Sequence, residues 1–293
     1  MTTTTHRAPL PFWKTRRGQQ RLVRLASLAA IVAGGALLLL PFYWLVTTSL
    51  KRPDEVYQFP PVWFPPEPQF GNYVQALTLV PLYRYAANTF TIVGAVLVGT
   101  ILSCSFTAYG FARLRAPGRD LIFMLLLATL MLPGAVTLVP TYLLFNALGW
   151  VNTLLPLIVP SFFGSAFFIF MLRQFYLTIP RELEEAAIID GASPYQIWWR
   201  IMLPLSAPAL ATMAVFTFVS TYNDFFTPLI YLTDDGKQTI AVALSYFQGS
   251  PRVGPQMHLL MAAVALSIVP PMTLFLVAQR YFVRGIATTG LKG

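Results

Sequence analysis

Six long apolar segments alternate with shorter polar stretches along the chain. They cover about residues 25–50, 88–112, 121–145, 154–175, 206–232 and 258–281, so each is 22 to 27 residues long. About 20 apolar residues in a helix are enough to cross the hydrocarbon core of a bilayer. The pattern therefore predicts an all-α fold: a polytopic membrane protein with six transmembrane helices.

Prolines interrupt this pattern. Six prolines within residues 51–70 exclude a long helix after the first segment, and Pro270-Pro271 break the sixth. The third segment breaks where Met131, Pro133, Gly134 and Pro140 lie. Such breaks occur in membranes only where protein or a wet cavity satisfies the freed backbone groups. These four residues therefore either line a cavity on the substrate path or form a packing kink, and the sequence leaves both open.

The basic residues favour one orientation of the spans. Fifteen of the 20 Lys and Arg lie before the first segment, in 113–119, in 173–204 or at the C-terminal end, and five lie in the other loops. Cytoplasmic loops carry the excess of Lys and Arg. Both termini and the loop 176–205 are therefore predicted in the cytoplasm. The first segment is too long for a signal-peptide core and is expected to be an uncleaved span.

This orientation divides the chain into a basic cytoplasmic tail over 1–24, a transmembrane domain over 25–282 and a cytoplasmic tail over 283–293. Only 11% of the residues are charged and 56% are hydrophobic, with a mean hydropathy of +0.62, whereas a soluble domain is about one quarter charged. The net charge of +9 comes from the ends of apolar segments, so it indicates orientation rather than nucleic-acid binding. The single cysteine, Cys104, is expected to be a small buried apolar residue.

The stretch 180–204 mixes acids, bases and good helix formers between two apolar segments. Pro180 and the acids that follow suit the first turn of a helix. Gly191 is expected to end that helix, and Ser193-Pro194 resembles an N-cap followed by the first residue of a second helix. The sequence predicts a helix, a sharp glycine turn and another helix on the cytoplasmic side.

The spacing within this hairpin resembles the EAA loop of ABC importer permeases. The residues that match are Glu185, Ala186, Ala187, Asp190, Gly191, Ile201, Leu203 and Pro204. The resemblance implies a type I permease whose hairpin couples it to a separate ATPase. It implies that Glu185 meets a basic group of that ATPase, that the two alanines permit close approach and that Gly191 sets the bend. Gly191→Asp is then expected to uncouple ATP hydrolysis from uptake. An ordinary amphipathic hairpin is the alternative.

Two further segments are similar to carbohydrate importers of this class. They are 222–229, which begins Tyr222-Asn223-Asp224, and the C-terminal stretch from Gln279 to Gly293, in which Thr289 and Leu291 depart from the usual pattern. The resemblance is to the six-span, maltose-G-like partner of a permease pair. It implies a second homologous permease subunit, two ATP-binding subunits and an extracytoplasmic substrate-binding protein. Tyr222, Asn223 and Asp224 either bind sugar on the substrate path or form an interfacial belt and a helix end.

Residues for catalysis are scarce. The chain lacks a G-x-x-x-x-G-K-[ST] phosphate-binding motif, and His6 and His258 do not form a plausible metal site. No nucleophile and base pair is evident, so a non-catalytic subunit is expected, without a cofactor of its own. ATP and Mg are expected on the partner ATPase.

The favoured function is the permease of an ATP-driven, binding-protein-dependent importer of a sugar or oligosaccharide in the bacterial cytoplasmic (inner) membrane. Import of glycerol 3-phosphate or glycerophosphodiesters is an alternative within the class, although the mid-span regions offer no arginine for a phosphate. An ion-coupled carrier that works alone is the alternative outside it. Such carriers usually need acids or bases at mid-membrane, and those are rare in this sequence.

Overall fold

The computed structural model describes residues 16–249 and 255–289, and this part of the chain is helical without any strand. The predicted all-α fold is confirmed. The long helices are α1 (Arg16–Ser49), α3 (Leu82–Arg113), α11 (Ala207–Tyr222) and α14 (Met257–Thr289). The shorter ones are α2 (Gly71–Leu79), α4 (Arg119–Ala128), α5 (Gly134–Ala147), α6 (Leu155–Ile158), α7 (Ala166–Thr178), α8 (Glu182–Ile189), α9 (Pro194–Ile197), α10 (Leu203–Leu205), α12 (Phe226–Tyr231) and α13 (Ile240–Tyr246).

Four of the described stretches are long and apolar enough to cross a membrane: Leu22–Ser49, Leu82–Arg113, Leu155–Thr178 and Met257–Gln279. Two further apolar pairs are bent. One joins Arg119–Met131, which includes the 3-10 turn η2 (Thr129–Met131), to Gly134–Ala147 at 100°, and the other joins Pro194–Leu205 to Ala207–Tyr222 at 78°. If each bent pair counts as one span, the total is six. The first bend falls at Pro133, where the sequence predicted a break.

Several boundaries differ in detail from the expected segments. Residues 16–24, expected within the basic tail, already belong to α1, and α14 continues to Thr289 through part of the expected C-terminal tail. The segment expected over 206–232 contains two helices, because α11 ends at Tyr222 and α12 begins at Phe226. Residues 1–15 and 290–293 lie outside the described part of the chain.

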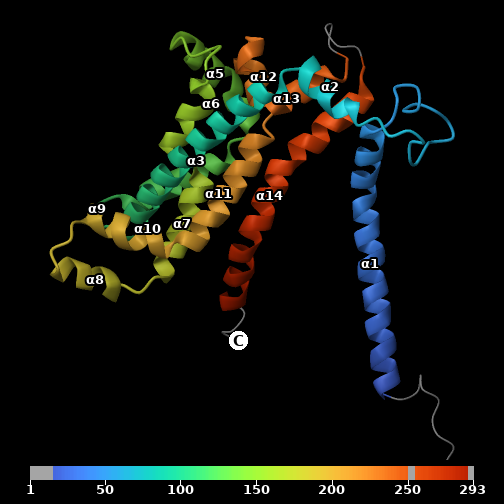
Figure 1. Ribbon diagram of the computed structural model, residues 1–293. Helices are drawn as coiled ribbons and strands as arrows, with labels where there is room; N and C mark the ends of the chain where they lie inside the picture. The colour runs from blue at the N-terminus through green and yellow to red at the C-terminus, as the bar shows by residue number, and fades with distance from the viewer. Residues whose placement is uncertain (1–15, 250–254, 290–293) are drawn as a thin grey trace, which may run out of the picture.

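Helix α3 is the centre of the bundle. It packs against α7, α11 and the 3-10 turn η3 (Val159–Phe163), and α11 in turn packs against α14. Helix α1 meets α14 but stands apart from the bundle along most of its length (Figure 1). Its most apolar stretch has no buried residue. Such a surface needs a lipid or protein cover, because exposed apolar area of this extent is unfavourable in water.

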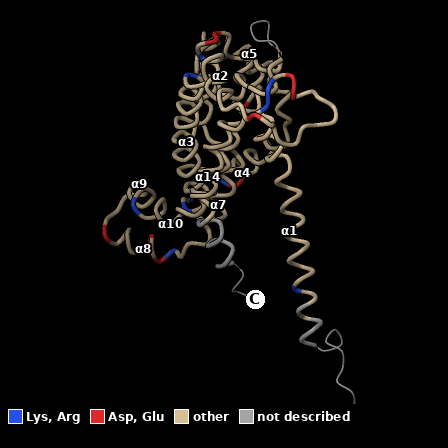
Figure 2. The backbone as a smooth tube through the Cα atoms, turned by 45° about the vertical axis from the view of Figure 1, so that its right-hand side comes forward, with Lys and Arg blue, Asp and Glu red and all other residues tan. Residues whose placement is uncertain are grey.

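Two buried clusters lie at opposite ends of the bundle. One gathers residues of α2, α3, α13 and α14 around Phe247 and Leu259. The other gathers residues of α3, α7, α8 and α11 around Tyr176 and Met202. We call this second end, which also holds α8, α9, the first turns of α1 and the last turns of α14, the hairpin end (Figure 1). The proline-rich residues 51–70 lie at the opposite end, and charged residues are sparse between the two (Figure 2).

The fourth segment is broken at Gly164-Ser165, between η3 and α7, and small residues let α3 approach this break. A Cβ atom added to Gly99 would lie 2.8 Å from two ring carbons of Phe162. One turn later, the Ser103 hydroxyl donates to the carbonyl of Ser161 at 2.9 Å. Cys104, buried and free as expected, accepts a hydrogen bond from the Ser165 N–H at 3.2 Å. These contacts satisfy backbone groups that the break leaves without helical partners.

Candidate functional site

The first arm of the hairpin is α8, which starts one residue after Arg181. Glu182, Glu184 and Glu185 occupy its first turn, as predicted, where the helix dipole favours negative charge. Glu185 is exposed, and none of the ion pairs between described residues includes it. Its carboxylate is therefore open to a partner. The pairing with a basic group of an ATPase stays a prediction.

The turn after α8 has the geometry that the sequence predicted. Gly191 has φ +79°, in the left-handed region that glycine adopts without steric cost. Its N–H donates to the Ile188 carbonyl at 3.0 Å, and the Ala192 N–H donates to the Ala187 carbonyl at 2.9 Å. This pair of bonds is the Schellman motif, which satisfies the last carbonyls of a helix. Asp190 is the C-cap residue and is exposed.

The second arm begins with a capping box. The Ser193 N–H donates to Gln196 Oε1 at 2.8 Å, and the Gln196 N–H donates to Ser193 Oγ at 3.4 Å. Pro194 occupies the first turn, as expected. A π-helical turn, η4 (Trp198–Met202), then leads into α10. π-Helical turns are rare in proteins, and those that occur often lie at functional sites.

The motif residues of the hairpin divide between an inner and an outer face. Ala187 is buried, and Ile201 and Leu203 pack against the cluster at the hairpin end. Ala186 is exposed, and close approach of an ATPase at the two alanines stays a prediction. Pro204 is also exposed. Ala187, Ile201 and Leu203 fix the hairpin to the bundle. The exposed motif residues, such as Ala186 and Pro204, remain available to a partner.

Apolar side chains cover much of the outer face of the hairpin. Ile189 is 85% exposed, and Leu183, Ile188, Tyr195 and Trp199 are also exposed. Ile189 lies one turn from Glu185, so both face the same side of α8. Acids and apolar residues on a projecting helix form a surface that a protein partner with basic and apolar groups would fit.

One contact of the hairpin was missed by the sequence reasoning. Glu184, the neighbour of the predicted Glu185, has its Oε1 atom 2.9 Å from Nε of Arg113, the last residue of α3. Burial raises the pKa of the Glu184 carboxyl, and the charges of Arg113 and Arg181 oppose that rise. The only sequence signal was an arginine at the end of an apolar segment and one acid more than the motif requires.

The four residues proposed for the substrate path do not form one site. The Tyr222 side chain is 3% exposed, its hydroxyl donates to the Ser267 carbonyl at 2.8 Å, and its ring stacks on Phe218. Asn223 is exposed and donates to the Val219 carbonyl at 2.9 Å. Met131 is 84% exposed at the bend after α4. Tyr222 and Asn223 thus have structural partners at the end of α11, and a substrate contact by any of the three stays a prediction.

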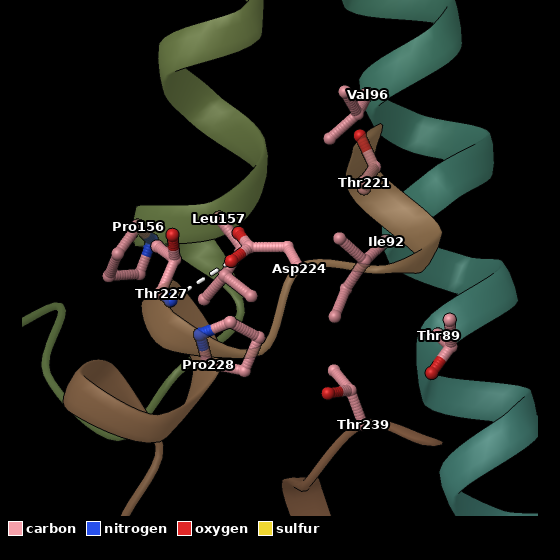
Figure 3. Close-up of a pocket in the computed structure, with 10 residues that line it drawn as sticks. All are labelled: Thr89, Ile92, Val96, Pro156, Leu157, Thr221, Asp224, Thr227, Pro228 and Thr239. Atoms are coloured by element: carbon pink, nitrogen blue, oxygen red, sulfur yellow. Dashed lines mark hydrogen bonds between the residues drawn. The ribbon is translucent and has the colours of Figure 1, made fainter. Parts of the chain in front are cut away.

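Asp224 lines a cavity of about 210 Å³ between α3, α6 and the start of α12 (Figure 3). Its Oδ1 atom accepts a hydrogen bond from the Thr227 N–H at 3.1 Å. The other lining residues are threonines and apolar residues: Thr89, Ile92, Val96, Pro156, Leu157, Thr221, Thr227, Pro228 and Thr239. The buried Thr239 hydroxyl has no hydrogen-bond partner. One carboxylate and several hydroxyls therefore border a space that suits a small polar group.

A helical bundle with exposed apolar flanks and a charged hairpin at one end is typical of a polytopic membrane protein. Residues 95–288 match the family described as the binding-protein-dependent transport system inner membrane component. The chain therefore belongs to this family: it is the membrane permease component of a binding-protein-dependent ABC importer.

Several relatives align over nearly the whole chain. The melibiose/raffinose/stachyose import permease protein MelC of Bacillus subtilis is 33% identical, over 95% of this chain and 99% of its own. The sn-glycerol-3-phosphate transport system permease protein UgpE of Pectobacterium atrosepticum is 32% identical, over 93% of this chain and 98% of its own. The crystal structure of a bacterial ABC transporter involved in the import of the acidic polysaccharide alginate has a chain of the same fold, with a TM-score of 0.76 and 24% identity, over 94% of this chain and 100% of that chain.

Proposed function

We propose that this permease imports a sugar or oligosaccharide and that a separate ATPase drives it through the hairpin of α8 and α9. The observation that carries the proposal is the exposed outer face of the hairpin, with Glu185 unpaired and Ile189 almost fully exposed. A lone carrier has no need of such a surface. ATP and Mg would be bound by the partner, because this chain has no phosphate-binding motif.

The proposed complex contains a second homologous permease, two ATP-binding subunits and an extracytoplasmic substrate-binding protein. The hairpin and both terminal helix ends would face the cytoplasm, in agreement with the distribution of Lys and Arg. The second permease or lipid could cover the exposed length of α1. Either could also fill a largely apolar groove that lies between α1, α11, α13 and α14.

The cavity at Asp224 favours a neutral sugar over a phosphate ester. Its lining includes no Lys or Arg, and the Asp224 carboxylate would repel a phosphate group. Carboxylate and threonine oxygens instead accept hydrogen bonds from sugar hydroxyls. Melibiose, raffinose and stachyose, named for the MelC relative, are neutral, whereas the UgpE relative is named for glycerol 3-phosphate.

Transport in proteoliposomes tests the proposal. The chain is reconstituted with its partner permease and ATPase, and uptake of labelled oligosaccharides or glycerol 3-phosphate is measured with the loaded binding protein outside. We expect oligosaccharide uptake that requires both ATP and the binding protein. Uptake of glycerol 3-phosphate alone would support the alternative within the class. Uptake by this chain without the ATPase, driven by an ion gradient, would contradict an ABC mechanism.

The variant Ile189→Asp is expected to weaken docking of the ATPase by at least about tenfold, because a central apolar contact would be replaced by a charge that loses its hydration. Copurification of the ATPase with the detergent-solubilised permease measures this. Ile189→Leu keeps the volume and polarity of the side chain and should dock normally. Equal docking of both variants would place the interface elsewhere on the hairpin.

The variant Asp224→Asn is expected to raise the substrate concentration for half-maximal uptake by about tenfold, because hydrogen bonds to a charged group are stronger than those to an amide. The asparagine oxygen can still accept the Thr227 N–H, so the start of α12 should be preserved. Asp54→Asn, an exposed carboxylate after α1, is the matched charge control. If Asp224→Asn transports as well as this control, Asp224 acts only as a helix cap.

A further inference from the structure

Arg113 joins three helices at the hairpin end. Its side chain is 3% exposed although it is the last residue of α3. Nε lies 2.9 Å from Glu184 Oε1 in α8, and Nη2 donates to the carbonyls of Tyr176 and Ile179 at the end of α7. The Glu184 side chain is itself only 13% exposed. One guanidinium group thus connects the ends of α3 and α7 to the first turn of α8.

The chemistry of arginine suits this position. The last carbonyls of a helix have no helical partner, and they attract cations through the helix dipole. Arginine has five N–H donors in a fixed planar arrangement, so it can serve two carbonyls and one carboxylate at once. A lysine ammonium would keep the charge but not this geometry. The two carbonyl bonds therefore fix the direction of the guanidinium group, while Nε and Glu184 Oε1 form a buried ion pair without a hydrogen bond.

The remaining attachments of α8 are few. Short connections without regular helix, at 179–181 and 190–193, lead into and out of it. Ala187 is the only buried residue of α8. Within α8, a force applied to the outer face would thus reach the bundle directly through Ala187 and the Arg113–Glu184 contact, while Ile201 and Leu203 anchor the second arm.

Helix α3 can carry such a force to the opposite end. It runs without a break from Leu82 to Arg113 and packs against α7, α11 and η3. Thr89, which lines the cavity with Asp224, belongs to the same helix. At 1.5 Å per residue, about 36 Å of continuous helix separates Thr89 from Arg113. A movement of the last turn of α3 would therefore displace the wall of the cavity.

We propose that the Arg113–Glu184 ion pair is the link that transmits movement of the docked hairpin to α3 and through α3 to the cavity at Asp224. Both are positioning residues, since Arg113 and Glu184 are buried at the hairpin end and do not line the cavity at Asp224. This proposal rests on the proposed function, because it requires an ATPase that moves α8. It differs from that function in placing the transmission on two residues of the inner face rather than on the docking surface.

The test uses Arg113→Lys and Glu184→Gln in the complete complex in proteoliposomes, with Arg119→Lys and Asp120→Asn as matched controls. The Arg119–Asp120 pair has the same chemistry, with Nη2 and Oδ1 3.0 Å apart, but it links adjacent residues, whose side chains are 28% and 75% exposed. Three quantities are measured: copurification of the ATPase, ATP hydrolysis stimulated by the loaded binding protein, and substrate imported per ATP hydrolysed.

We expect both inner variants to retain the ATPase and to hydrolyse ATP, while import per ATP falls at least about fivefold, the lower end of typical coupling between sites. The control variants should match the wild type. Normal import per ATP in the inner variants would overturn the proposal. So would parallel loss of copurification and both activities, since the pair would then only stabilise the complex. A wild-type complex without ATP-dependent import would instead contradict the proposed function itself.

Discussion

Replacing Gly191 by valine is expected to reduce ATP-driven import at least about tenfold while the protein still reaches the membrane. Gly191 has φ +79°, and a left-handed backbone costs an L-residue about 1–2 kcal/mol, with β-branched residues the least tolerant. Two hydrogen bonds of the Schellman motif depend on this conformation. A different turn would change the direction of α9 relative to α8. The hairpin would then present Glu185 and Ile189 in an altered arrangement.

The cause of this effect is the local backbone conformation and not a clash with other parts of the structure. A Cβ atom at Gly191 would have no atom within 4 Å beyond its chain neighbours, so it would not clash with the rest of the hairpin. Asparagine adopts the left-handed region more readily than other residues, and Gly191→Asn should therefore retain most of the transport. Import per ATP and membrane abundance are measured for both variants. Similar activity in the valine and asparagine variants would show that the turn tolerates another conformation.

The hairpin was predictable because its signals are local. Gly191 after the last helical residue and Ser193-Pro194 before the next helix specify a C-cap and an N-cap through neighbours in the sequence. The apolar segments were predictable for a similar reason, since a bilayer requires a certain length of continuous apolar helix. The helix ends that fall inside these segments were less predictable. α11 ends at Tyr222, inside the segment expected over 206–232, and the Tyr222 hydroxyl there donates to the Ser267 carbonyl of α14.

The contacts between distant parts of the chain could not be predicted in this way. No periodicity relates Arg113 to Glu184, which meet only because α3 and α7 end side by side. Tyr222 was proposed for the substrate path from the resemblance of 222–229 to carbohydrate importers, and that resemblance does not predict that its ring stacks on Phe218. The threonines around Asp224 follow no motif in the sequence, and only the fold brings them to one cavity.

Replacing Gly99 by leucine is expected to cause a larger loss of folded protein than any substitution in the hairpin. A Cβ atom there would already be 2.8 Å from the Phe162 ring and in contact with the Ser161 side chain. Overpacking of this kind costs about 1–3 kcal/mol or more, because side chains leave their preferred rotamers and the backbone shifts. Close approach of α3 and η3 would be lost, together with the bond from Ser103 to the Ser161 carbonyl.

Gly94, on the same helix, provides the matched control because a Cβ atom there would have no atom within 4 Å. Gly94→Leu should keep or raise thermal stability in detergent, since leucine has a higher helix propensity than glycine by nearly 1 kcal/mol. Size-exclusion profiles after heating compare the two variants. Equal stability would mean that the break in the fourth segment moves to accept a side chain. In that case the contacts of Ser103 and Cys104 would not fix the position of the break. Helix α3 would then be held less rigidly along the length over which the Arg113–Glu184 link must act.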